Sequence, residues 1–177
     1  MRVSAHYYFT DTVKKINYDE MISKLKEILG DINLYRLDKY HLTYSELKIL
    51  NHISIAYLQK GNNFEAIEIL KQLVTNRKKL KISIHEEIEI IPLLLCNISS
   101  MLINSKKYDE AYDYAKKALK ISNEYGASIE LPEIHLNIAR CINKLEKDKE
   151  KVNIFILRGF HCANALGRRT NNRKKNC

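Results

Sequence analysis

Apolar side chains recur along most of this chain with the three- and four-residue spacing of amphipathic helices. Within residues 17–30, this spacing places Met21, Leu25, Ile28 and Leu29 on one face, and Gly30 is suited to end the helix. The pattern predicts an all-α protein of about seven helices with no convincing strand. The predicted helices cover residues 17–30, 43–60, 63–80, 85–104, 108–125, 132–145 and 149–166, and the fourth is kinked or restarted at Pro92.

The helix boundaries carry recognisable signals. Thr43 and Glu46, in "TYSE", have the spacing of a capping box, in which each side chain accepts a hydrogen bond from the other residue's backbone amide. Pro132 suits the first turn of a helix, where its missing N–H costs nothing. The passage 79–90 alternates in places and is the one where a strand competes. Short loops between the helices predict antiparallel hairpins stacked in chain order.

Two stretches of the chain nearly repeat each other: "KGNNFEAIEIL" from Lys60 and "SKKYDEAYDYA" from Ser105. When Ala66 is aligned with Ala111, the preceding helices align as well, and Ser54 matches Ser99. Each unit is therefore a helix, a turn and a second helix with small residues at fixed places. We expect Ser54 to face Ala66, and Ser99 to face Ala111, because small residues let paired helices cross closely.

This pattern resembles the tetratricopeptide repeat, which has a small residue in its first helix, then Tyr, Gly, Ala, an aromatic residue and Ala. The first unit includes the Gly, at Gly61, whereas the second has Lys106 in its place. A third unit is weaker, because Lys151 occupies the position where Ala is expected. Either the register slips there, or the helix splays and Lys151 points outward. The resemblance implies a right-handed superhelix of stacked hairpins.

The passages "LTYSELKILNHISIAYLQKGNNFEAIEIL", "LLLCNISSMLINSKKYDEAYDYAKKAL" and "LPEIHLNIARCINKL" together resemble a larger unit. It is the C-terminal sensor domain of the Gram-positive transcription regulators that join a helix-turn-helix to a tetratricopeptide array, the peptide-pheromone-sensing type. The resemblance covers roughly residues 18–166. No helix-turn-helix domain precedes it here, so a fragment, an excised domain and a stand-alone relative are open alternatives. The family implies a non-catalytic module that binds a short peptide or protein segment.

Stacked hairpins form a superhelix whose concave face is lined by the first helix of each pair. Asn97 and Asn137 share one repeat position there, and the family resemblance implies that such Asn residues hold the backbone of an extended peptide. An Asn amide can donate and accept at once, and Arg140 could bind a carboxylate. The alternative is that these Asn residues bond within the scaffold or face water. The candidate groove residues are Asn51, His52, Asn97, Ser100, Asn104, Asn137, Arg140 and Lys144.

Charge divides the chain unevenly. Of the net charge of +9, +7 lies after Glu150, where no acidic residue occurs, and the first 150 residues carry the remaining +2. We therefore expect an N-terminal extension over 1–16, a helical repeat domain over 17–166 and a flexible basic tail over 167–177. Contact of this tail with nucleic acid is the alternative to simple solvation. No aromatic residue of the tail could stack on a base.

The remaining motifs argue against an enzyme. There is no G-x-G-x-x-G, P-loop or G-x-S-x-G sequence, and no His, Cys or carboxylate spacing typical of a metal site. The longest apolar run is far shorter than the roughly 20 residues that cross a bilayer. We expect a cytoplasmic protein without metal or cofactor. A structural adaptor that mediates dimerisation or docking without a small ligand is the alternative function. The four cysteines, Cys96, Cys141, Cys162 and Cys177, do not form a C-x-x-C pair.

Overall fold

Seven α-helices account for most of the chain in the computed structural model, which describes residues 17–125 and 129–175, with side chains up to residue 167. Two short 3-10 helices, η1 (Leu37–Lys39) and η2 (Arg77–Lys79), lie in the connections. The predicted all-α class is confirmed. The helices are α1 (Tyr18–Leu29), α2 (Tyr44–Gln59), α3 (Asn63–Thr75), α4 (Ile84–Asn104), α5 (Tyr108–Tyr125), α6 (Leu131–Leu145) and α7 (Lys149–Lys175).

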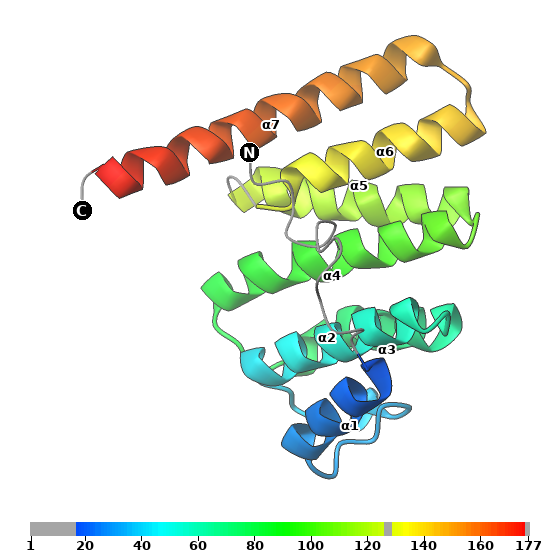
Figure 1. Ribbon diagram of the computed structural model, residues 1–177, viewed down its shortest axis with the longest axis vertical. Coiled ribbons are helices and arrows are strands. Elements are labelled where there is room, and N and C mark those ends of the chain that lie inside the picture. Colours follow the sequence, from blue (N-terminus) through cyan, green and yellow to red (C-terminus); the bar gives the residue numbers. More distant parts are fainter. Residues whose placement is uncertain (1–16, 126–128, 176–177) are drawn as a thin grey trace.

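The helices pair into three hairpins, α2–α3, α4–α5 and α6–α7, which stack in chain order with α1 at one end and α7 at the other (Figure 1). The backbone of α2 approaches that of α4, and α4 approaches α6, whereas the second helices of successive hairpins do not approach each other in this way within the described residues. The first helices are therefore on the inner side of the curve. This is the arrangement that gives an α-solenoid its concave face.

The two repeated stretches build the same crossing in two hairpins. Ser54 Oγ donates to the carbonyl oxygen of Ala66 at 2.7 Å, and Ser99 Oγ donates to that of Ala111 at 2.8 Å. All four residues are completely buried. A hydroxyl that reaches a backbone carbonyl of the partner helix needs the two backbones close together, which the alanines allow. The predicted pairing of small residues is confirmed.

The turn inside each of these hairpins also has the same shape. Gly61 adopts a left-handed backbone with φ of 84°, and Lys106 adopts the same region with φ of 60°. In this region a residue with a Cβ atom is strained, so Gly is the usual choice. The second hairpin thus keeps the turn geometry of the repeat without its Gly.

The third hairpin shows that the register slips at Lys151. The Lys151 side chain is exposed and pairs with Glu146 and Asp148. The next residue, Val152, packs against the core instead. A one-residue shift therefore puts an apolar residue at the place that alanine holds in the other hairpins. Further along α7, Gly159 is buried against α6.

Several boundaries differ from the sequence prediction. Helix α3 ends at Thr75, because η2 takes up the next residues before α4. The competing strand over 79–90 is absent from the described structure apart from one isolated bridge, Thr43 to Lys81, and Ser83 caps α4 with Glu86. Pro92 lies within a continuous α4.

Other predicted segments lie beyond the described parts. The extension 1–16 falls outside the described residues. Helix α7 continues past residue 166, but the side chains from residue 168 onward are not described, so the tail remains a prediction. Among the described helices, none is both long and apolar enough to span a membrane.

Candidate functional site

A row of polar side chains crosses the inner helices α2, α4 and α6. This polar row consists of Asn51, Asn97, Ser100, Asn137 and Arg140. Its first link joins neighbouring hairpins: Asn97 Nδ2 donates to Asn51 Oδ1 at 2.9 Å. Asn51 is 5% exposed, so its side chain lies within the scaffold. Asn97 is half-buried, and its second amide hydrogen and its carbonyl oxygen make no hydrogen bond to the described residues. Asn97 therefore retains one donor and one acceptor for a further partner.

The second link of the row is centred on Asn137. Its amide nitrogen donates to Ser100 Oγ at 2.8 Å and to the Cys96 carbonyl oxygen at 3.3 Å. The residue is fully buried. Both amide hydrogens are thus used between α6 and α4, so Asn137 binds these helices together. Sequence equivalence with Asn97 did not reveal this difference, because it depends on how deeply each helix packs.

Arg140 lies one turn beyond Asn137 on α6. Its Nη1 is 3.5 Å from Asn137 Oδ1 and 3.5 Å from Glu133 Oε1. The side chain is 49% exposed, so its remaining N–H groups are open to solvent. A guanidinium steadied by two long contacts on one side can still form a bidentate pair with a carboxylate on the other. Arg140 is therefore the main positive charge presented by the row.

Three other predicted groove residues lie at exposed positions. His52 follows Asn51 on α2, Asn104 ends α4, and Lys144 lies in the last turn of α6. Asn104 and Lys144 make no hydrogen bond or ion pair with the described residues. The structure thus links Asn51 with Asn97, and it links Ser100 and Arg140 with Asn137. Asn104 and Lys144 lie outside these hydrogen-bonded groups.

The cysteine beside the row is unsuited to chemistry. Cys96 is 2% exposed, and burial, with a smaller contribution from Glu133, raises the pKa of its thiol far above the ordinary value. Burial likewise raises the pKa of Cys141 to about 11. Both thiols stay protonated, and a protonated thiol is a poor nucleophile and metal ligand. Within the described residues no three His, Cys, Asp or Glu side chains cluster as a metal site would require.

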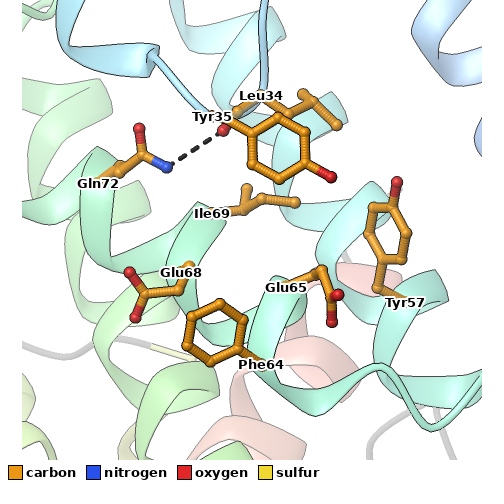
Figure 2. Close-up of a pocket in the computed structure, with 8 residues that line it drawn as sticks. All are labelled: Leu34, Tyr35, Tyr57, Phe64, Glu65, Glu68, Ile69 and Gln72. Atoms are coloured by element: carbon orange, nitrogen blue, oxygen red, sulfur yellow. Dashed lines mark hydrogen bonds between the residues drawn. The ribbon is translucent and has the colours of Figure 1, made fainter.

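A cavity of about 210 Å³ lies elsewhere, between α3, the end of α2 and the linker that follows α1 (Figure 2). Gln72 holds the linker against α3, donating to the Leu34 carbonyl oxygen at 3.1 Å and accepting from the Leu37 amide at 3.0 Å. Sequence reasoning missed this cavity, because the repeat pattern of "NNFEAIEIL" predicts only the packing of paired helices. It is lined by Leu34, Tyr35, Tyr57, Phe64, Glu65, Glu68, Ile69 and Gln72.

Two comparisons with known proteins found a match, one to a family model and one to a solved structure. The model described as the RNPP family C-terminal domain matches residues 3–159. The crystal structure of Bacillus thuringiensis PlcR in complex with the peptide PapR7 and DNA is similar, with a TM-score of 0.71 at 18% sequence identity. The similarity covers 90% of this chain and 54% of that one, so this chain spans about half the length of its structural relative. None of the curated proteins matches the sequence.

Proposed function

The chain belongs to the RNPP family, and we propose that it is the peptide-binding sensor module of a transcription regulator. An extended peptide would lie along the inner face formed by α2, α4 and α6. The observation that carries this proposal is the polar row. It crosses the first helices of three successive hairpins and offers hydrogen-bonding groups that the scaffold does not use. The similarity to PlcR, crystallised with a peptide, supports the fold needed for such binding.

The residues of the row would have different roles. Asn97 would bind the peptide backbone through its unused amide hydrogen and carbonyl oxygen. Arg140 would bind a carboxylate of the peptide, either a side chain or the C-terminus. Asn51 and Asn137 would position these two residues from within the scaffold. His52, Ser100, Asn104 and Lys144 would border the same face, as the sequence predicts.

Binding would be tested with short peptides selected from a random library on the immobilised protein. Their dissociation constants would then be measured by calorimetry with the wild type and with Asn97→Ala and Arg140→Ala. Losing a hydrogen bond to a charged group costs about 1.5–3 kcal/mol, so we expect Arg140→Ala to weaken binding about tenfold or more. Asn97→Ala should weaken binding of the same peptides without changing helicity.

Asn137→Ala is a poor test of contact, because removing its buried amide would also loosen the packing of α4 and α6. Asn123→Ala, on an exposed part of α5, is the matched control and should leave affinity unchanged. Selected peptides whose affinity is the same for the wild type, Asn97→Ala and Arg140→Ala would contradict binding on the inner face.

A second function, docking or dimerisation, is favoured by the outer face of α7. Ile156, Leu157 and Phe160 are 47%, 57% and 63% exposed, although α7 ends the stack and could bury this face only against another element. Neighbouring exposed apolar residues of this kind mark interaction surfaces. If α7 mediates dimerisation, Leu157→Glu should shift a sedimenting dimer toward monomer, whereas Asn153→Glu should not. A wild type that sediments as a monomer at all concentrations would exclude dimerisation through α7.

A further inference from the structure

The cavity beside α3 is separate from the inner face. None of the eight candidate groove residues lines it. Three aromatic residues, Tyr35, Tyr57 and Phe64, line the same cavity as Glu65 and Glu68, whose carboxylates point in different directions in Figure 2. The linker that forms one wall is held in place by Gln72, so the cavity is built from fixed elements.

The lining favours a positively charged group. Phe64 and Tyr35 are 73% and 77% exposed, so large aromatic faces meet solvent here. Glu65 and Glu68 lie three residues apart and therefore project from the same side of α3. Neither forms an ion pair within 4 Å among the described residues. Aromatic faces attract cations through the ring quadrupole, and carboxylates add charge-assisted hydrogen bonds.

The next hairpin already contains such a contact, made within the protein. By the repeat alignment, Glu110 is equivalent to Glu65, and Tyr114 is equivalent to Ile69. Lys71, from the preceding hairpin, forms an ion pair with Glu110, and its Nζ is 5.9 Å from the centroid of the Tyr114 ring. A basic side chain from the preceding unit thus fills this place in the second hairpin.

The first hairpin is preceded by the linker instead. The linker residues that reach this place are Leu34 and Tyr35, which bring no positive charge to Glu65. Lys26 Nζ donates to Tyr57 Oη at 3.0 Å and lies 5.6 Å from that ring's centroid, and Lys71 on α3 interacts electrostatically with Glu68. Lys26 forms no ion pair with either carboxylate of the cavity. Glu65 therefore has no ion pair among the described residues that corresponds to the pair between Lys71 and Glu110.

We propose that this cavity, lined by Tyr35, Tyr57, Phe64, Glu65 and Glu68, receives a basic side chain from a partner polypeptide. Its volume of about 210 Å³ is below the range of roughly 300–1,000 Å³ typical of drug-sized ligands, so it suits one side chain. Arginine fits best, because its planar guanidinium can lie against an aromatic ring while it pairs with carboxylates. The partner would occupy the position that Lys71 occupies for the second hairpin.

The proposal is tested by NMR with N-acetyl-arginine amide as the probe and N-acetyl-citrulline amide as its uncharged counterpart. The chain has four phenylalanines, so ring signals from labelled phenylalanine are few, and Phe64→Leu identifies the one at the cavity. We expect the arginine probe to move the Phe64 signal in a saturable way and the citrulline probe to leave it unchanged. Glu65→Gln combined with Glu68→Gln should weaken arginine binding at least tenfold.

Asp113→Asn is the matched control, because Asp113 is exposed and occupies the equivalent position to Glu68 in the second hairpin. It should bind the probe like the wild type. The proposal is overturned if the arginine probe gives no saturable shift, if both probes act equally, or if the double Gln variant binds unchanged. Salt-sensitive self-association that the double Gln variant loses would support it and identify the partner as a second copy. Peptide affinity at the inner face should be unaffected by the double Gln variant.

Discussion

The first two hairpins and the third achieve close helix crossing in different ways. In α2–α3 and α4–α5, a serine hydroxyl in the first helix bonds to the carbonyl of an alanine in the second. In α6–α7, Gly159 takes the close contact: a Cβ atom there would lie 3.1 Å from the Pro132 carbonyl oxygen and 3.4 Å from His135 Cβ. All three hairpins thus have a small residue at a close helix contact, whereas the hydrogen bond from serine to an alanine carbonyl occurs in the first two.

His135 and Phe155 fill the rest of the third crossing. The centroids of their rings lie 5.8 Å apart. The guanidinium of Arg158 lies over the Phe155 ring, 5.5 Å from its centroid. His135 Nδ1 is buried without a hydrogen-bond partner in the described structure. The third hairpin is therefore held by ring packing, which protonation can disturb, while the first two are held by groups that do not titrate near neutral pH.

The largest effect is expected from filling the glycine contact. Gly159→Leu would force a side chain against the Pro132 carbonyl, and overpacking of this kind typically costs about 1–3 kcal/mol. The free energy of unfolding, measured by urea denaturation, should fall by that amount. Gly167→Leu on the same helix is the control, since a Cβ there meets nothing within 4 Å, and it should be neutral or slightly stabilising. Equal effects at both positions would show that helix propensity, and not the crossing, is responsible.

A smaller and matched effect is expected in the first two hairpins. Ser54→Ala and Ser99→Ala each remove one buried hydroxyl hydrogen bond, which contributes about 1 kcal/mol. Because the two crossings have the same geometry, the losses of unfolding free energy should agree within about 0.5 kcal/mol. Ser45→Ala, at an exposed position of α2, should cost nothing measurable. Clearly unequal losses would mean that the two units are not energetically equivalent.

The smallest effect at neutral pH concerns the titration of His135. Burial, followed by the positive charge of Arg158, lowers the pKa of His135 below its ordinary value of 6.5. The folded protein therefore binds this proton less readily than the unfolded chain, so stability is lost as the pH falls through 6.5 toward the folded pKa. His135→Leu should make the unfolding free energy less sensitive to pH between 7 and 5.

His85→Asn provides the comparison for this pH dependence. His85 is exposed near the start of α4, so its replacement is the control for removing a histidine that lies outside the core. The slope is best measured as the midpoint of urea unfolding at several pH values. If His135→Leu keeps the full acid sensitivity of the wild type, the titrating group lies elsewhere in the protein.

Much of the scaffold could be predicted from the sequence. The spacing of apolar residues located the seven helices, and the capping box at Thr43 was confirmed with both of its hydrogen bonds. The alignment of Ser54 with Ser99 was also confirmed in detail. The end of α3 and the register at Lys151 were harder, because helix propensity continues through residues 76–80 and because lysine can point outward with little cost.

The candidate site was less accessible to prediction. Helical geometry placed Asn97 and Asn137 on the same face, but it could not show that one is half-buried and the other fully buried. That difference arises from the packing of α4 against α6, which brings the Cys96 carbonyl and Ser100 to Asn137. Equivalent repeat positions therefore do not guarantee equivalent availability to a ligand.

The sequence by itself determined the repeat, the small residues at its crossings and the family to which the chain belongs, since these depend on residue type and spacing. Only the tertiary structure decided which polar groups are used up within the protein. Asn51 pairs with Asn97 and Lys71 pairs with Glu110, whereas Glu65 faces a cavity without a basic partner among the described residues. The physical reason is that such pairing depends on the neighbouring hairpin, whose position the local pattern does not encode.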